Sequence, residues 1–163
     1  MSIATADLHE AINTAWDASS LNTLFQNLWS GYETEFPVLH DQEASPGQPF
    51  PYVIMEQTST NVVTRMSTSV GKREIRDIEC TFNVQARAIS GDSRTAKEIA
   101  SYLAEEIMKV FGGHPTSAPS GTITLNSGNH LITQYLNDYG VRTGDDEYQW
   151  TIEYRFRLDV PIR

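Results

Sequence analysis

The chain has 163 residues, of which 39% are apolar and 20% are charged, and its formal net charge at pH 7 is −9. This length and composition favour one soluble domain that buries a core without metal or disulfides. The acidic balance excludes a surface that binds nucleic acid by general neutralisation of phosphates.

The single cysteine and the chain's first residues bear on its location. Cys80 has no second cysteine to pair with, so nothing indicates an oxidising compartment. The start, MSIATADLHE, lacks the basic and apolar regions of a signal peptide, and no apolar run is long enough for a transmembrane helix. We therefore expect a protein that is located or assembled in the cytoplasm, without a membrane.

Two helices, a loop and a strand are expected in the first part of the chain. Apolar residues recur at helical spacing over residues 5–18, with Thr5 as the N-cap, and again over residues 21–29. Prolines and a Pro-Gly pair in residues 41–51 predict a loop. Residues 52–58, YVIMEQT, predict a strand.

The next segment, STNVVTRMSTSVGK at residues 59–72, is rich in Ser and Thr and poor in apolar residues. This composition suits an extended, exposed hairpin tip better than a core element, and the segment is long enough to be functional or disordered in the free protein. We therefore expect a mobile hairpin at residues 60–72 within a single domain that spans residues 1–163.

The second half predicts a strand, a helix and two further strands. Alternation of apolar and polar residues predicts a strand over residues 73–89, and Asp92 or Ser93 is expected to cap the helix that follows. Residues 122–141 and 148–160 predict the last two strands. Short turns join antiparallel strands. We therefore expect an α+β fold, with an antiparallel or mixed four-stranded sheet packed against helices in the order α-α-β-β-α-β-β.

No group of residues predicts catalysis, a cofactor or a metal. The histidines lack the spacing of a zinc site, and a solvated loop explains His40, Asp41 and Glu43 better than a ligand cluster does. Cys80 alternates with apolar residues on a strand, which favours an inert buried thiol. The remaining histidines are His9, His114 and His130. The chain is therefore not expected to be an enzyme.

An acidic run, Asp145-Asp146-Glu147, lies in the last expected turn. It lacks the alternation of a calcium loop, and a solvated polar turn is the favoured interpretation. The alternative is an incidental divalent ion or an acidic contact to a partner.

The last strand carries both signs of charge on its polar side. One interpretation is a sheet that faces solvent, with cross-strand ion pairs. The other is a contact with another subunit, because faces of mixed sign set the register of symmetric assemblies. The residues concerned are Glu153, Arg155, Arg157 and Asp159.

Four features occur together in this sequence: an N-terminal helix, FPYVIMEQT as a strand preceded by proline, CTFNVQARA followed by the helix AKEIASYLAEEIMKVF, and the closing strand YQWTIEYRFRLDV. Together they resemble the tail terminator (tail completion) proteins of long-tailed bacteriophages. The helix at residues 21–29 and the long segment STNVVTRMSTSV depart from the family pattern. They leave open a different neck or head–tail connector protein.

The resemblance implies a virion structural protein of the tail or neck that is assembled in the host cytoplasm. About six copies would form a homo-oligomeric ring. This ring would cap the tail tube, stop its polymerisation and join the head–tail connector protein. DNA would pass through the lumen without specific binding. A tail tube subunit, or a small-molecule-binding α+β module, remains an alternative.

Two sets of residues are expected to make the contacts of such a ring. The exposed hairpin is expected to dock on the tail tube, through Thr60, Asn61, Thr64, Arg65, Ser67, Thr68 and Lys72. The charged side of the last strand is expected to contact the next subunit, through Glu153, Arg155, Arg157 and Asp159.

Overall fold

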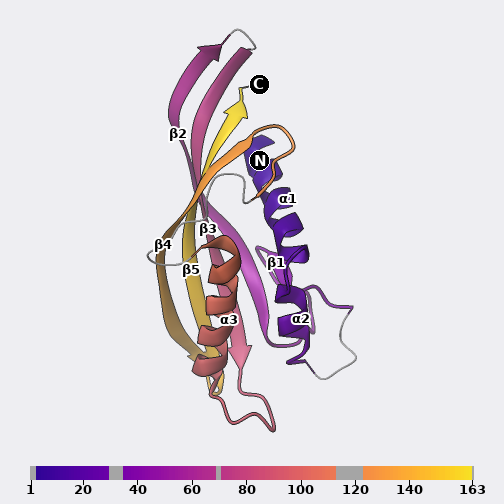
Figure 1. Ribbon diagram of the computed structural model, residues 1–163. Coiled ribbons are helices and arrows are strands. Elements are labelled where there is room, and N and C mark those ends of the chain that lie inside the picture. The colour runs from indigo at the N-terminus through magenta and orange to yellow at the C-terminus, as the bar shows by residue number, and fades with distance from the viewer. Residues whose placement is uncertain (1–2, 30–34, 69–70, 113–122, 163) are drawn as a thin grey trace.

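The computed structural model describes residues 3–29, 35–68, 71–112 and 123–162. These residues form three helices and five strands, which confirms the predicted α+β fold (Figure 1). Along the chain the elements are α1 (Ile3–Asp17), α2 (Leu21–Gln26), β1 (Leu39–Asp41), β2 (Tyr52–Thr68), β3 (Gly71–Arg87), α3 (Ala96–Phe111), β4 (Asn129–Gly144) and β5 (Glu147–Pro161).

The strands form one mixed sheet in the order β1-β2-β3-β5-β4. β1 pairs with β2 in parallel, and the other neighbours are antiparallel. The sequence predicted four strands, and the fifth is β1. With three residues, β1 is too short to show the alternation by which a strand is predicted.

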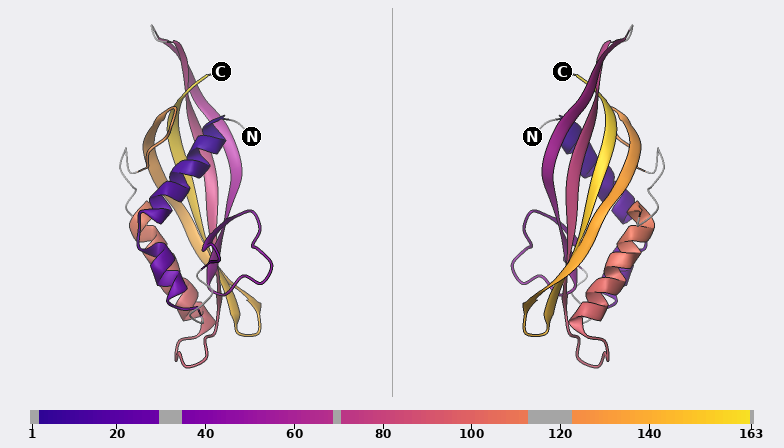
Figure 2. Two further views of the ribbon diagram at one scale, coloured as in Figure 1. Left: turned by 90° about the vertical axis from the view of Figure 1, so that its right-hand side faces the viewer. Right: turned by 90° about the vertical axis from the view of Figure 1, so that its left-hand side faces the viewer.

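The three helices lie on one side of the sheet (Figures 1 and 2). Trp16 of α1 reaches across to the sheet and to α3: its ring centroid lies 6.1 Å from that of Phe82 and 6.5 Å from that of Phe111. All three side chains are at most 1% exposed. The core is therefore a layer between one sheet face and the helices, and the opposite sheet face has no helix over it in the described part of the chain.

The start of α3 differs from the prediction. Its N-cap is Thr95, whose hydroxyl accepts a hydrogen bond from the backbone N–H of Glu98 at 3.2 Å. The predicted caps, Asp92 and Ser93, are wrong. The carboxylate of Asp92 instead accepts hydrogen bonds from the backbone N–H and the guanidinium of Arg94, in the turn before the helix.

Both N-terminal helices also differ at their ends. α1 begins at Ile3, so Thr5 lies inside it and is not its N-cap. α2 ends at Gln26, three residues before the predicted end at residue 29. Periodicity located these helices but not their termini, where capping contacts decide.

β2 and β3 are 17 residues long each, and they pair from Tyr52 and Gln85 to Thr68 and Gly71. The Ser/Thr-rich segment is therefore extended, as predicted, but it belongs to a paired strand. Its β-branched Thr and Val residues favour a strand. Two irregularities interrupt the register of β2, at Thr58 and Val63. Residues 69–70 lie outside the described residues, and the mobility of the hairpin stays a prediction.

Candidate functional site

The described residues hold no group of three or more His, Cys, Asp or Glu side chains that could bind a metal ion. His9 lies 3.7 Å from the carboxylate of Asp41, while His40 is buried and stacks edge-on against Tyr52. His114 lies outside the described residues. Among the described residues, no helix is long and apolar enough to cross a membrane. The candidate sites are therefore surfaces of the sheet.

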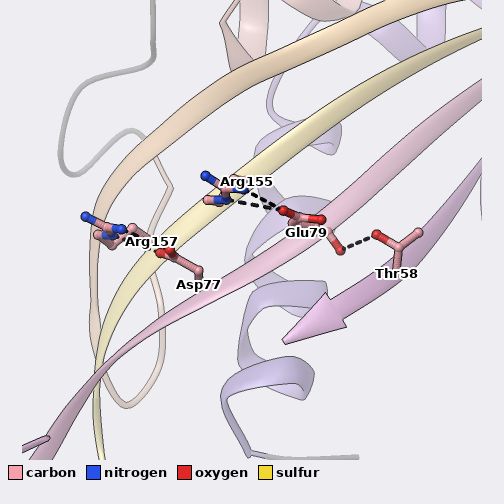
Figure 3. Close-up of polar contacts among 5 residues, drawn as sticks. All are labelled: Thr58, Asp77, Glu79, Arg155 and Arg157. Atoms are coloured by element: carbon pink, nitrogen blue, oxygen red, sulfur yellow. Dashed lines mark hydrogen bonds and ion pairs between the residues drawn. The ribbon is translucent and has the colours of Figure 1, made fainter. Parts of the chain in front are cut away.

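The uncovered face of the sheet carries the charged residues that the sequence singled out. Arg155 of β5 binds Glu79 of β3, with 2.8 Å between Nη2 and Oε1 (Figure 3). Arg157 binds Asp77 through two hydrogen bonds of 2.8 and 2.9 Å, and these bonds raise the pKa of its guanidinium. Thr58 of β2 donates to the backbone carbonyl of Glu79 at 3.4 Å. Charge on this face is therefore paired from strand to strand.

Two more ion pairs join the same two strands. Arg73 binds Asp159 at 2.8 Å, and Arg87 binds Glu147 at 2.5 Å. Glu153 has no ion pair among the described residues. Three of the four residues predicted to contact another subunit therefore have a partner within the chain: Arg155, Arg157 and Asp159. The geometry matches the cross-strand interpretation, and contact with another subunit stays a prediction.

Neutral polar side chains lie on this face between the ion pairs Arg155–Glu79 and Arg87–Glu147. Gln85 and Gln149 are linked at 2.8 Å, and the amide oxygen of Asn83 accepts from the hydroxyl of Thr151, also at 2.8 Å. The polar groups of this face therefore bind one another. A face of this kind is stable in water and does not need to be covered by a partner.

The two edges of the sheet have a different character. The described residues expose seven large apolar side chains by 37% or more, and six of them lie either on the edge strand β4 or on the part of β2 that β1 does not cover. These are Val62, Val63 and Met66 on β2, and Leu136, Tyr139 and Val141 on β4; the seventh is Tyr102 on α3. Exposed edges with apolar side chains are sites at which strands or other chains attach.

Sequence reasoning missed these edges. Alternation along a strand shows which side chains share a face, but not which strand has a neighbour on each side. β1 covers only Val53–Met55 of β2, so the rest of that edge is open in the described structure. Among the described strands, β4 pairs on one side only, with β5.

The predicted docking hairpin lies at one end of this open edge. Of its predicted contact residues, Thr68 lies at the end of β2 and the others are exposed: Thr60, Asn61, Thr64, Arg65, Ser67 and Lys72. An ion pair and a hydrogen bond within the chain hold the base of the hairpin. Arg76 binds Glu74 at 2.6 Å and the hydroxyl of Thr60 at 3.0 Å. The structure therefore gathers these residues on one projection, while their contact with a tail tube stays a prediction.

Comparison with known proteins adds one finding on the fold. No protein-family model matches the chain, and no curated protein matches it. Solved structures share its fold. A chain of the structure described as the virion of a native gene transfer agent (GTA) particle matches with a TM-score of 0.53 and 17% sequence identity. The match covers 95% of this chain and 96% of that chain, so the likeness extends over the whole fold.

Proposed function

We propose that this chain is a structural protein of a virion, and that it acts as a tail terminator. The observation that carries the proposal is the full-length likeness of fold to a chain of the gene transfer agent virion, with 95% of this chain covered. A fold by itself does not fix a function. The proposal therefore also depends on the surfaces that this chain exposes.

The exposed surfaces suit assembly better than catalysis. The apolar side chains on β2 and β4 are exposed on open strand edges, where a partner can cover them. The described residues form no metal cluster, and the one cysteine is buried. An assembly protein needs such edges, while an enzyme needs a set of convergent reactive groups.

The terminator role itself comes from the resemblance of the sequence. About six copies form a ring on the end of the tail tube, stop its growth and present a surface to the head–tail connector. The net charge of −9 suits a ring through which DNA passes, because a surface of the same sign does not retain it. Binding to the tube end and arrest of its growth distinguish this role from that of a tube subunit or a connector.

The experiment adds the purified protein to tail tube subunits that are polymerising, and electron microscopy follows tube length. We expect shorter tubes that carry a ring at one end. Lys109→Ala is the control, because this lysine lies on α3, its side chain is 70% exposed, and it pairs with Glu106 on the same helix. This variant should cap as the natural chain does. Unchanged tube growth with no ring at the ends would contradict the proposal. Tubes formed by this chain alone would assign it as a tube subunit instead.

A further inference from the structure

The two ends of the sheet carry opposite charges beside exposed apolar residues. The β2–β3 hairpin projects at one end, and the turn between β4 and β5 lies at the other (Figure 1). The register of neighbouring strands gives the distance along the sheet between Val62, towards the hairpin end, and Gly140, towards the turn end. Val62 is level with Arg76 and through it with Leu158 on β5, while Gly140 is level with Trp150. Eight residues of extended strand separate these two levels, which is about 27 Å.

The hairpin end is apolar and basic. Residues 58–73 contain three basic residues, Arg65, Lys72 and Arg73, and no acidic residue, although the whole chain has a net charge of −9. The side chain of Arg65 is 70% exposed, and its distance to Glu74 is 3.7 Å. Lys72 has no ion pair among the described residues. Val63 and Met66 are 48% and 40% exposed within this basic segment.

The turn end is apolar and acidic. Residues 139–147 contain three carboxylates and one arginine, and of these carboxylates Glu147 is paired with Arg87 of β3. Asp145 is fully exposed, with 3.2 Å between its carboxylate and Arg142, and the exposed Asp146 has no ion pair in the described part of the chain. Beside them on β4, Tyr139 and Val141 are 43% and 49% exposed.

We propose that the chain binds to a second copy of itself head to tail, with the hairpin end of β2 on one copy packed against the β4 end of the next. Apolar residues would meet apolar residues, and Arg65 and Lys72 would approach Asp145 and Asp146. The two surfaces differ from each other, so the contact is heterologous and leaves a free hairpin and a free turn on every pair. Such contacts continue into a closed ring or an open filament.

This contact goes beyond the proposed function, because copies could associate in this way whatever the assembly does. Its use in a terminator ring rests on the proposed function. In this arrangement a second copy, and not the tail tube, occupies the hairpin, and the experiment distinguishes these two partners.

Disulfide trapping tests the pairing. Val63→Cys and Val141→Cys are made in separate proteins, mixed and oxidised. In one chain the two positions lie much too far apart for a disulfide, which needs Cα atoms within about 7 Å. Covalent dimers in the mixture therefore report a contact between copies. Tyr102→Cys provides the matched control, since Tyr102 is 37% exposed but lies on α3 and not on β2 or β4.

We expect a several-fold excess of dimers in the mixture of Val63→Cys and Val141→Cys over the mixture of Val63→Cys and Tyr102→Cys. Equal yields would overturn the inference. Dimers of Val63→Cys alone in the same excess would also overturn it, because they indicate a symmetric contact. Protection of Val63→Cys from a thiol reagent by tail tubes, without any excess of mixed dimers, would assign the hairpin to the tube.

Charge variants supply a second readout that needs no cysteine. Arg65→Glu with Lys72→Glu should weaken self-association about tenfold in light scattering, because like charges would then meet. Asp145→Lys with Asp146→Asn should restore it when placed in the partner copy; asparagine is chosen because residue 146 has a φ of 58°. Failure of the second pair to restore association would overturn the inference. Normal dimer trapping with no capping of tubes would contradict the terminator role alone.

Discussion

Arg157 and Asp77 face each other across β5 and β3, joined by two hydrogen bonds of 2.8 and 2.9 Å. The side chain of Asp77 is 12% exposed and that of Arg157 is 42% exposed, so the pair lies partly within the sheet surface. Arg155 and Glu79 repeat the arrangement two residues along each strand. The arginines on the last strand that predicted a contact with another subunit thus form ion pairs between two strands of one chain.

A charge swap tests this in-chain role. Arg157→Asp should lower the free energy of unfolding by about 1 kcal/mol, because it removes the ion pair and places two carboxylates opposite each other. Adding Asp77→Arg should recover most of the loss. Urea denaturation of the single and double variants provides the measurement. Unchanged stability of the single variant, together with loss of self-association, would contradict the in-chain role and indicate a subunit contact.

Truncation of Phe82 is expected to cause a large loss in the free energy of unfolding. Its ring lies 5.2 Å from that of Phe111 and 5.8 Å from that of Tyr154, and it is 0% exposed. Phe82→Ala should lower the free energy of unfolding by about 3–5 kcal/mol through lost burial and a cavity. Tyr102→Ala, at an exposed position, should cost less than about 1 kcal/mol. Similar losses for both in urea denaturation would show that Phe82 is not central to the core.

The sequence predicted the helices and strands better than it predicted which strands lie side by side in the sheet. Helical spacing and strict alternation identified α1, α3, β3 and β5, because each is long enough to repeat its pattern. It could not show that β3 pairs with β5, since α3 and β4 separate them along the chain. The partners of Arg155 and Arg157 were therefore left open between this chain and another.

The same gap explains what was missed in the candidate site. Val62, Val63 and Tyr139 are ordinary strand residues in the sequence. They become notable only because β4 is an edge strand and β1 leaves most of β2 uncovered among the described residues. Which strands form the edges is a property of the topology and does not follow from the local pattern.

Gly140 on β4 allows two aromatic rings to lie against the strand. A Cβ atom at this position would lie 2.4 Å from Cε1 of Tyr148 and 2.8 Å from Cε3 of Trp150. Gly140→Ala should therefore destabilise the protein by about 1–3 kcal/mol through overpacking. Gly144→Ala is the matched control, because the nearest atoms to its added methyl belong to the side chain of Glu147 and lie at 3.4 Å or more. Equal stability of the two variants would contradict this role of Gly140.

Cys80 should be inert in the folded protein. It is fully buried in the core layer, and burial raises the pKa of its thiol to about 12. A thiol reagent applied near neutral pH should not react with the native protein, but should label one thiol per chain in concentrated urea. Fast labelling without denaturant would show that the core opens locally around β3.

Tyr135 predicts a loss of stability at alkaline pH. Burial raises the pKa of its phenol to about 12, and the hydrogen bond to the carboxylate of Asp138 adds to this effect. In the unfolded chain the phenol of Tyr135 ionises near pH 10, so folding favours the neutral phenol. This contribution to stability is fully present below about pH 10 and is lost as the pH rises through about 12.

Tyr135→Phe should therefore lose less stability than the natural chain between about pH 9 and about pH 11 in urea denaturation. Burial also raises the pKa values of Tyr52 and Tyr154, so part of the pH dependence should remain in the variant. The same loss in both proteins would contradict the role of Tyr135.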